Sequence, residues 1–279
     1  MDGWNYHDRN QQVNSVCLME PVGDEPVRAY CGVERSSGIV EIYRPAGKIT
    51  DEKFPGAGGG MGPMTQITQI DGAIYACGAD GSVFKRQANG WVNFNEGFNT
   101  QTLVDYQSQG YSLSDAISMQ IKNQSYIESI TGKDGNLFAV GLFGLLYHRK
   151  ESIWRAVDSP TNASLYRVKV FDKDTVYIVG EKGIILKGNE KGFKVIHTNV
   201  RDDFKCLEFF NGKIYVGGYK GLYVLDGETI TIVDTKQKNE FECVALDARE
   251  GQLLMVSERW ILVFEGKDWK RIDHPDNVK

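Results

Sequence analysis

The histidines are the first residues to consider as ligands of a metal ion. The four histidines lie far apart, without the HxH or HExxH spacing that brings imidazoles together: His7, His148, His197 and His274. A zinc site needs three or four converging ligands. The sequence therefore favours structural or solvent-facing histidines, and neither a metal nor another cofactor is expected.

The five cysteines are an odd number and include no CxxC pair. Cys31 and Cys77 stand directly before a turn glycine, where valine stands in other copies of the repeat described below, and Cys17, Cys206 and Cys243 lie in predicted first strands. This pattern favours small buried hydrophobic side chains over a nucleophile or a metal ligand. It also suits the reducing cytoplasm better than a disulfide framework.

Two further segments carry groups that bind phosphate or cations in other proteins. The glycine-rich run at residues 56–62 lacks the GK[ST] ending of a P-loop and leads through Pro63 into a strand, so it predicts a flexible loop. The adjacent pair Asp202 and Asp203 offers two carboxylates for a cation. Neighbouring carboxylates on a loop are more often simply solvated.

The composition is that of a globular protein with a sizeable core: 279 residues, 41% hydrophobic and 25% charged. A net charge of −5 argues against non-specific nucleic-acid binding and suits a basic protein partner. The N-terminal residues show no secretory signal. The longest apolar stretch, residues 137–147, is shorter than the roughly 20 residues of a membrane span. We therefore expect a cytoplasmic chain without a membrane partner.

An internal repeat organises the sequence. The segments 74–94, 137–157, 176–196 and 214–233 each contain an apolar strand, a Gly-x-x-Gly turn, a second apolar strand, a polar turn and a third strand. The turn glycines are Gly78/Gly81, Gly141/Gly144, Gly180/Gly183 and Gly218/Gly221. A degenerate copy carries Ser257 and Trp260 in place of the glycines, and a first copy occupies residues 28–49. Tight hairpins need positive φ, which glycine adopts at little cost.

Another apolar stretch with alternating polarity precedes every copy, which makes four short strands per unit and six units. Four strands about every 40 residues are typical of a β-propeller blade. The sequence thus predicts an all-β chain that forms a single β-propeller domain over residues 1–279. Six blades are expected. A seventh, broken blade is the alternative, since residues 3–7 are similar to the fourth strand at residues 90–94, and a β-sandwich is the alternative fold.

The blade motif resembles that of the bacterial Ycf48-type and BNR-like propellers. The resemblance lies in the motif VGLFG at residues 140–144, followed by Trp154, and in VGEKG at residues 179–183. It implies the propeller fold over most of the chain. The Asp-box S-x-D-x-G-x-T-W of that group is absent from every blade, and the arginine cluster and Tyr–Glu pair of a sialidase cannot be identified.

Propeller geometry places the connections between blades on the same face as the turns between second and third strands. The long segments all belong to this face: residues 54–63, 96–123, 158–164, 197–203 and 234–240. The segment at 96–123 is an insertion between the second and third blades, with a possible helical turn at 114–122. Because loops on a rigid scaffold often carry recognition, we expect a partner protein to bind here.

The candidate partner-binding residues on this face are aromatic or charged. Phe143 and Tyr219 stand in the middle of Gly-x-x-Gly turns, where a merely structural turn favours polar residues, and raised aromatics are typical interface anchors. The candidates are Phe98, Tyr106, Tyr111, Phe143, Glu181, Arg201, Asp202, Asp203, Tyr219, Lys220 and Arg259. The alternative is that the insertion covers the ring and its aromatic side chains pack within the chain.

These features predict a non-catalytic, protein-binding propeller that is a monomer by itself. The sharpest form of this hypothesis is a bacterial immunity protein that binds and neutralises a toxin, with a basic toxin domain as the partner. A scaffold or assembly factor is an alternative. A hydrolase or lyase with a central-channel site is another, and its candidate residues are Glu20, Glu128, Arg167 and Glu208.

Overall fold

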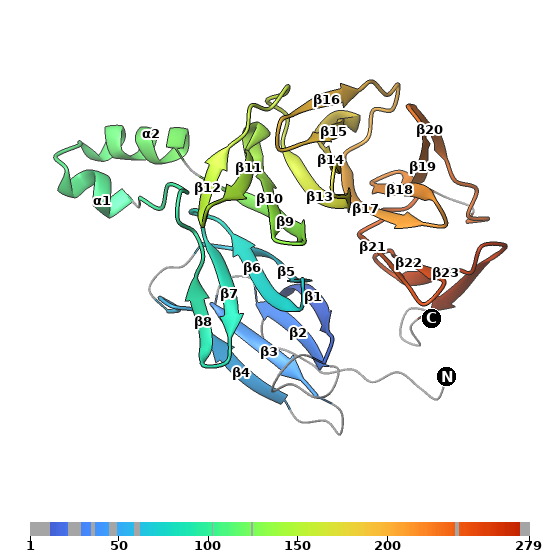
Figure 1. Ribbon diagram of the computed structural model, residues 1–279, viewed down its shortest axis with the longest axis horizontal. Coiled ribbons are helices and arrows are strands. Elements are labelled where there is room, and N and C mark those ends of the chain that lie inside the picture. Colours follow the sequence, from blue (N-terminus) through green and yellow to red (C-terminus); the bar gives the residue numbers. More distant parts are fainter. Residues whose placement is uncertain are drawn as a thin grey trace. The chain divides into compact units, whose positions relative to one another are not determined.

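Six four-stranded antiparallel sheets follow one another along the chain (Figure 1). The structure is a computed structural model that describes residues 12–21, 29–34, 37–44, 49–58, 62–101, 103–123, 125–237 and 240–273. In every sheet each strand pairs with the next strand of the sequence. Four strands in this order are the blade of a propeller. The prediction of an all-β, six-bladed β-propeller is therefore confirmed.

The first compact unit, Arg9–Ser159, contains three blades and two α-helices. Blade 1 consists of β1 (Val13–Met19), β2 (Ala29–Glu34), β3 (Ile39–Tyr43) and β4 (Ile49–Lys53); blade 2 of β5 (Met64–Ile70), β6 (Ala73–Gly78), β7 (Val83–Gln87) and β8 (Gly90–Asn93); and blade 3 of β9 (Ile127–Lys133), β10 (Asn136–Gly141), β11 (Leu146–Lys150) and β12 (Ile153–Ala156). Helices α1 (Leu103–Ser108) and α2 (Leu113–Asn123) lie in the sequence between blades 2 and 3.

The second compact unit begins at Pro160 and contains the other three blades. Blade 4 consists of β13 (Leu165–Asp172), β14 (Thr175–Gly180), β15 (Ile185–Asn189) and β16 (Gly192–Ile196); blade 5 of β17 (Phe204–Phe210), β18 (Lys213–Gly218), β19 (Gly221–Asp226) and β20 (Thr229–Ile232); and blade 6 of β21 (Ala245–Arg249), β22 (Gln252–Val256), β23 (Trp260–Phe264) and β24 (Trp269–Asp273). Short 3-10 turns, η2 (Leu142–Gly144) and η3 (Glu181–Gly183), join the second and third strands of blades 3 and 4.

The middle strands are apolar at nearly every position because both of their faces are buried. In β6, Ile74 and Ala76 belong to the core cluster shared with blade 1, and the alternate residues Tyr75 and Cys77 belong to the cluster shared with blade 3. Successive side chains of a strand point to opposite faces, so a strand between two packed sheets is apolar at both sets of positions. The core therefore lies between successive blades of a unit.

The two glycines of the Gly-x-x-Gly turns have different roles, which corrects the expectation that all of them supply positive φ. Gly183 does have a φ of +76°, and the residue before it, Lys182, is also left-handed at +56°. Gly141 and Gly180 instead have extended backbones, with φ of −170° and −169°. A Cβ on Gly141 would lie 1.8 Å from the carbonyl oxygen of Tyr126. The first glycine is thus needed because another backbone approaches it closely.

Cysteines Cys77, Cys206 and Cys243 are buried, as predicted. Cys17 is only partly buried, because β1 is an edge strand whose exposed and covered side chains nearly alternate, although it still packs against the first core cluster. The side chain of Cys31 lies outside the described residues, as do His7, His274 and the segment 3–7 of the alternative seventh blade.

Cys206 and Cys243 are in contact in the core of the second unit, with 3.8 Å between their sulfur atoms. Gly217 makes the room for them, because a Cβ there would lie 2.3 Å from the Cys243 sulfur. Hydrogen bonding with Cys206, together with burial, raises the pKa of the Cys243 thiol well above its ordinary value. Protonated buried thiols act as hydrophobic side chains, so this pair has a packing role.

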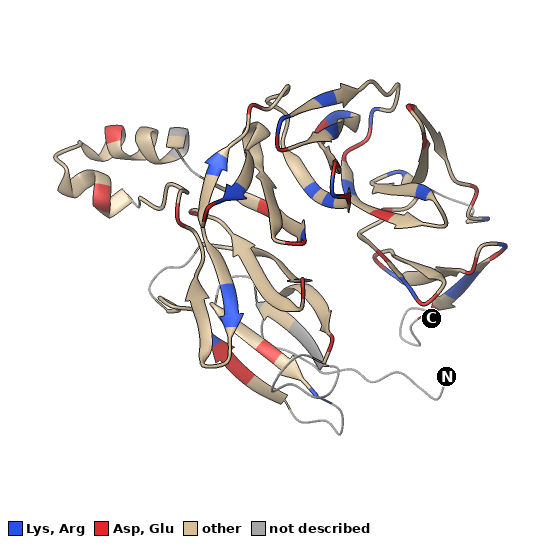
Figure 2. Cartoon of the chain, in the orientation of Figure 1, with Lys and Arg blue, Asp and Glu red and all other residues tan. Residues whose placement is uncertain are grey.

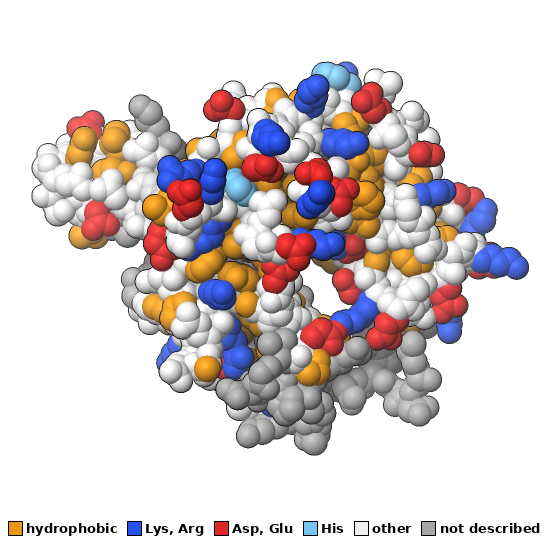
Figure 3. Space-filling model, in the orientation of Figure 1, with side chains coloured by type: hydrophobic (Ala, Val, Ile, Leu, Met, Phe, Trp, Pro, Cys, Tyr) orange, Lys and Arg blue, Asp and Glu red, His pale blue; other side chains and the backbone are white. Residues whose placement is uncertain are grey.

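Helices α1 and α2 form a hairpin with few charged side chains (Figure 2). Helix α2 begins after Ser112, whose hydroxyl accepts a hydrogen bond from the backbone N–H of Asp115 and donates one to its carboxylate. This reciprocal pair caps the helix N-terminus. Val104, Leu113 and Ile117 are exposed on the hairpin, where hydrophobic side chains reach the surface (Figure 3).

Candidate functional site

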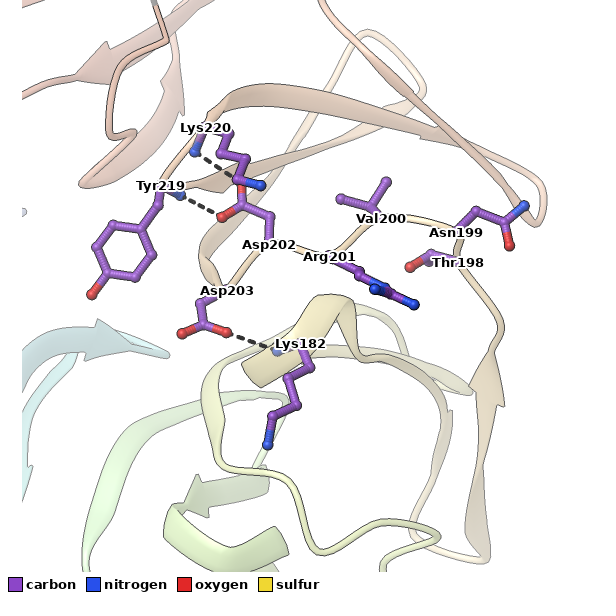
Figure 4. A pocket seen from close by; sticks show the side chains of 9 residues that line it. All are labelled: Lys182, Thr198, Asn199, Val200, Arg201, Asp202, Asp203, Tyr219 and Lys220. Atoms are coloured by element: carbon purple, nitrogen blue, oxygen red, sulfur yellow. Dashed lines mark hydrogen bonds between the residues drawn. The ribbon is translucent and has the colours of Figure 1, made fainter.

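The loop between β16 and β17 and two neighbouring turns surround a pocket of about 730 Å³ in the second unit (Figure 4). The turns are those between β14 and β15 and between β18 and β19. The lining residues are Lys182, Thr198, Asn199, Val200, Arg201, Asp202, Asp203, Tyr219 and Lys220. Candidate residues 201–203, 219 and 220, predicted from the loops alone, therefore meet in one place.

Asp202 holds the β18–β19 turn in place. Its carboxylate accepts hydrogen bonds from the backbone N–H groups of Tyr219 and Lys220, at 3.1 and 2.9 Å, and from the hydroxyl of Tyr223 at 3.0 Å. Its side chain is buried, and burial and the Asp202 carboxylate both raise the pKa of Tyr223. The sequence predicted that Asp202 would contact a partner. This stays a prediction, and the described hydrogen bonds of Asp202 hold the chain's own turn.

Asp203 holds the turn of the preceding blade. Its carboxylate accepts a hydrogen bond of 2.8 Å from the backbone N–H of Lys182, the left-handed residue of the β14–β15 turn. On the other side of that turn, the Glu181 carboxylate accepts a hydrogen bond from the backbone N–H of Ser164. Two successive aspartates thus connect the β16–β17 loop to turns of blades 4 and 5, which makes the rim of the pocket rigid.

The pocket lining carries both signs of charge, and its two carboxylates accept hydrogen bonds from backbone N–H groups rather than from its cationic side chains. Lys182 forms an ion pair of 2.7 Å with Glu181, and the hydrogen bond between them lowers the pKa of Glu181 and raises that of Lys182. Arg201 and Lys220 are exposed. Within the described parts of the chain, no ion pair or side-chain hydrogen bond neutralises either of them. Two cations therefore face solvent on a chain whose net charge is −5.

A lysine between two tyrosines supports the edge of the pocket. The Lys205 ammonium lies 4.0 Å from the ring centroid of Tyr166 and 4.7 Å from that of Tyr219. Burial lowers the pKa of Lys205, but a hydrogen bond with Tyr219 and the charges around it outweigh burial, so the pKa is raised overall. Cation–π contacts of this kind contribute about 0.5–2 kcal/mol. Tyr219 is thus ordered while 47% of its surface stays exposed.

Glu242 and Glu258 form a pair of like charges near Lys205, and this pair predicts that the stability of the protein depends on pH. Burial, and next the carboxylate of Glu258, raise the pKa of Glu242. A carboxyl group with a raised pKa in the folded state stabilises the fold below that pKa, and the contribution is lost as the pH rises through it. Replacing Glu258 with Gln removes the repulsion. It is expected to raise the melting temperature at about pH 7 and to change it little at about pH 4.

Thermal melting at the two pH values checks this expectation. Glu228→Gln, in an exposed turn of blade 5, is the matched control and is expected to leave the melting temperature unchanged at both. Equal melting temperatures of the wild type and Glu258→Gln at neutral pH would show that the repulsion does not act on stability.

Two of the predicted aromatic anchors pack inside the first unit instead. Phe98 is buried against Trp154 and Tyr147, with ring centroids 5.2 and 4.6 Å away. Tyr106 is also buried, and its hydroxyl accepts hydrogen bonds from the side-chain amides of Asn99 and Asn123. These contacts correct the prediction for both residues in favour of the alternative, intramolecular packing. The reason is that the loop before α1 packs Phe98 onto the core of blade 3, whereas Tyr106 packs inside the hairpin of α1 and α2.

Three other predicted residues, Phe143, Tyr111 and Arg259, are exposed. Phe143 is 69% exposed on the left-handed position of its turn, and Tyr111 packs edge-to-face on Tyr106 with 41% of its own surface exposed. Both belong to the first unit. Arg259 is exposed in the β22–β23 turn of the second unit.

Several residues around the pocket were not among the candidates. Lys182, Thr198, Asn199 and Val200 line it, although the sequence pointed to the loop that holds the last three. The contact between Tyr166 and Lys205 was also missed. The signal for it was available, because the two residues lie one repeat period apart, and such residues of first strands meet across neighbouring blades. Lys169 and Glu208 are related in the same way and form an ion pair, 39 residues apart.

Three observations concern the candidate residue Glu208 of the central channel, metal binding and membrane insertion. Glu208 is buried, and burial raises its pKa against the opposing effect of Lys169. In the parts of the chain that the structure describes, no three His, Cys, Asp or Glu side chains converge as a metal site. No described helix has the length and apolar character needed to cross a membrane.

Solved structures with this architecture include proteins of unrelated function. The WD40 β-propeller domain of Doa1 is 12% identical, with a TM-score of 0.70, and the match covers 96% of this chain and 84% of that one. A catalytically inactive virginiamycin B lyase from Staphylococcus aureus is 12% identical, with a TM-score of 0.72 and coverage of 99% and 88%. At these identities the likeness concerns the fold alone.

Comparison of the sequence with those of known proteins shows the family of the chain, which the fold alone does not. No family model matches the chain, so the grouping with Ycf48-type and BNR-like propellers stays a prediction. The immune protein Tsi7 of Pseudomonas aeruginosa is 30% identical over 233 residues, which cover 82% of this chain and 71% of that protein. Identity of this extent over most of both chains shows common descent. The chain therefore belongs to the family of bacterial immunity proteins that includes Tsi7.

Proposed function

We propose that this protein is a non-catalytic inhibitor that binds a cognate toxin and keeps it inactive, and that the pocket of the second unit is part of its binding surface. The observation that carries the proposal is the identity with an immune protein over 82% of the chain. The geometry supports it, because turns held by Asp202 and Asp203 lose little conformational freedom on binding.

The proposal also includes the net charge of the toxin and the cell compartment in which the two proteins meet. The net charge of −5 suits a toxin domain with net positive charge, since opposite charges speed diffusional encounter. The protein acts as a monomer in the cytoplasm, where a toxin that enters or is made in the cell must be stopped. Cys206 and Cys243 lie in contact, with 3.8 Å between their sulfur atoms, but form no disulfide, which suits a reducing compartment.

Co-expression tests the function directly. The toxin gene that neighbours this gene is expressed in a bacterial host with the wild-type protein, with an unrelated propeller, or alone. Growth is expected only with the wild-type protein, which is also expected to co-purify with the toxin. Continued killing of cells that contain the soluble, folded protein would contradict the proposal.

The exposed turn aromatics are expected to carry part of the affinity. Phe143→Ala combined with Tyr219→Ala is expected to weaken toxin binding by about tenfold or more, because large aromatic anchors dominate interface energies. Calorimetric titration of the purified toxin measures the change. Phe171→Ala, which removes an exposed aromatic side chain from β13, is the matched control. Unchanged binding of the double variant would exclude both residues as anchors.

The alternatives make different predictions. A scaffold or assembly subunit would co-purify with a larger complex and would not protect cells from the toxin. A hydrolase or lyase would turn over a substrate, and a broad activity screen of the purified protein detects it. Because Glu208, a candidate for that chemistry, is already paired with Lys169, we favour the binding function.

A further inference from the structure

Two cationic side chains of the pocket, Arg201 and Lys220, form no ion pair within the described residues. Arg201 and Lys220 line the pocket from two different segments, the β16–β17 loop and the β18–β19 turn (Figure 4). The carboxylates beside them, Asp202 and Asp203, are directed at backbone N–H groups. A ligand with carboxylate groups would give these two side chains ion-pair partners, and the guanidinium of arginine binds a carboxylate through two parallel hydrogen bonds.

The surroundings favour a protein segment as that ligand. Tyr219 lies on the rim, half exposed and held by Lys205, and offers an aromatic surface beside the two cations. Tyrosine and arginine are among the residue types that most often dominate protein interfaces. A polyphosphate chain is disfavoured, because a protein of net charge −5 repels an extended polyanion. A short acidic segment on a neutral or basic partner does not meet this repulsion.

We propose that the pocket binds an acidic segment of the toxin, with Asp or Glu carboxylates on Arg201 and Lys220 and an adjoining side chain against Tyr219. This inference rests on the proposed function and names the chemistry of the partner at this site. The opposite net charges of the two proteins attract them over long distances. Within the complex, the local contact between the basic side chains of the pocket and the acidic segment of the toxin fixes how the two proteins are aligned.

Charge reversal tests the pocket. Arg201→Glu with Lys220→Glu is compared with the control Lys191→Glu with Lys213→Glu, which makes the same change in net charge. The control lysines are exposed at the opposite ends of the strands of the second unit, Lys191 in the β15–β16 turn and Lys213 as the first residue of β18. Affinity for the purified toxin is measured by calorimetry, after thermal melting has verified that each variant is folded. The neutral variant Arg201→Gln with Lys220→Gln is measured as well.

The pocket variant is expected to bind the toxin about 100-fold more weakly, and the control within about threefold of the wild type. The neutral variant is expected to lie between them and to lose part of the salt dependence. If the wild type binds the toxin and the pocket variant binds equally well, the acidic-segment proposal is wrong and the inhibitor function stands. If the wild type does not bind the toxin at all, both proposals fail.

Discussion

Asp202→Ala is expected to lower the free energy of unfolding by about 3 kcal/mol, since three donors lose a charged acceptor. The hydroxyl of Tyr223 is buried with its residue, so water replaces the lost hydrogen bond there least well. The two backbone N–H groups belong to Tyr219 and Lys220, so the turn that lines the pocket loosens at the same time. Toxin affinity is therefore expected to fall even under conditions in which the variant remains folded.

Chemical denaturation and calorimetric titration measure these two effects. Asp202→Asn keeps an oxygen acceptor without the charge, and we expect about half of the loss of stability. Asp226→Ala removes an exposed carboxylate from the same sheet and is expected to change the unfolding free energy by less than about 0.5 kcal/mol. If Asp202→Ala unfolded at the same denaturant concentration as Asp226→Ala, the three hydrogen bonds of the Asp202 carboxylate would contribute nothing to the free energy of unfolding.

Gly141→Ala is expected to destabilise the protein by about 3–4 kcal/mol, although its backbone conformation is open to any residue. The new Cβ would lie 1.8 Å from the carbonyl oxygen of Tyr126 and 3.1 Å from the Cα of Ile127. Neither is the end of a flexible side chain, so β9 and β10 must separate. The backbone hydrogen bond from Leu142 to Tyr126 would be strained or broken as well.

Gly135→Ala in the same blade separates the two explanations for turn glycines. Gly135 has a φ of +78°, and no atom lies within 4 Å of the position that a Cβ would take there. A left-handed alanine costs about 1–2 kcal/mol. Equilibrium unfolding of the two variants is thus expected to show the larger loss for Gly141→Ala. The reverse order would mean that the main chain yields at Gly141 and that left-handed φ is the stronger constraint.

The fold was predictable because its signals are local and repeated. Apolar alternation and paired glycines recur along the chain, and the strand pairing follows the order of the sequence. The same regularity placed the β16–β17 loop and the β18–β19 turn on one face. The residues that line the pocket were therefore predictable in part from the sequence.

The functions of individual side chains were less predictable, because they depend on partners far along the sequence. Asp202 looks like a solvated loop carboxylate, but its donors come from residues 17 to 21 positions later. Phe98 and Tyr106 look like interface aromatics, and only the path of the insertion shows that they are buried. Gly78, Gly141 and Gly180 carry no local sign that a carbonyl of the preceding segment lies against them.

The clamps by Asp202 and Asp203 have a consequence for how such proteins diversify. Both carboxylates accept hydrogen bonds from main-chain N–H groups, which every amino acid except proline provides, so these bonds do not depend on the side chains of residues 182, 219 and 220. The left-handed backbone at residue 182 disfavours β-branched side chains there. New specificities are then accessible by exchanging these three side chains without rebuilding the scaffold. A library randomised at those positions and selected against other toxins would measure how many partners one scaffold can bind.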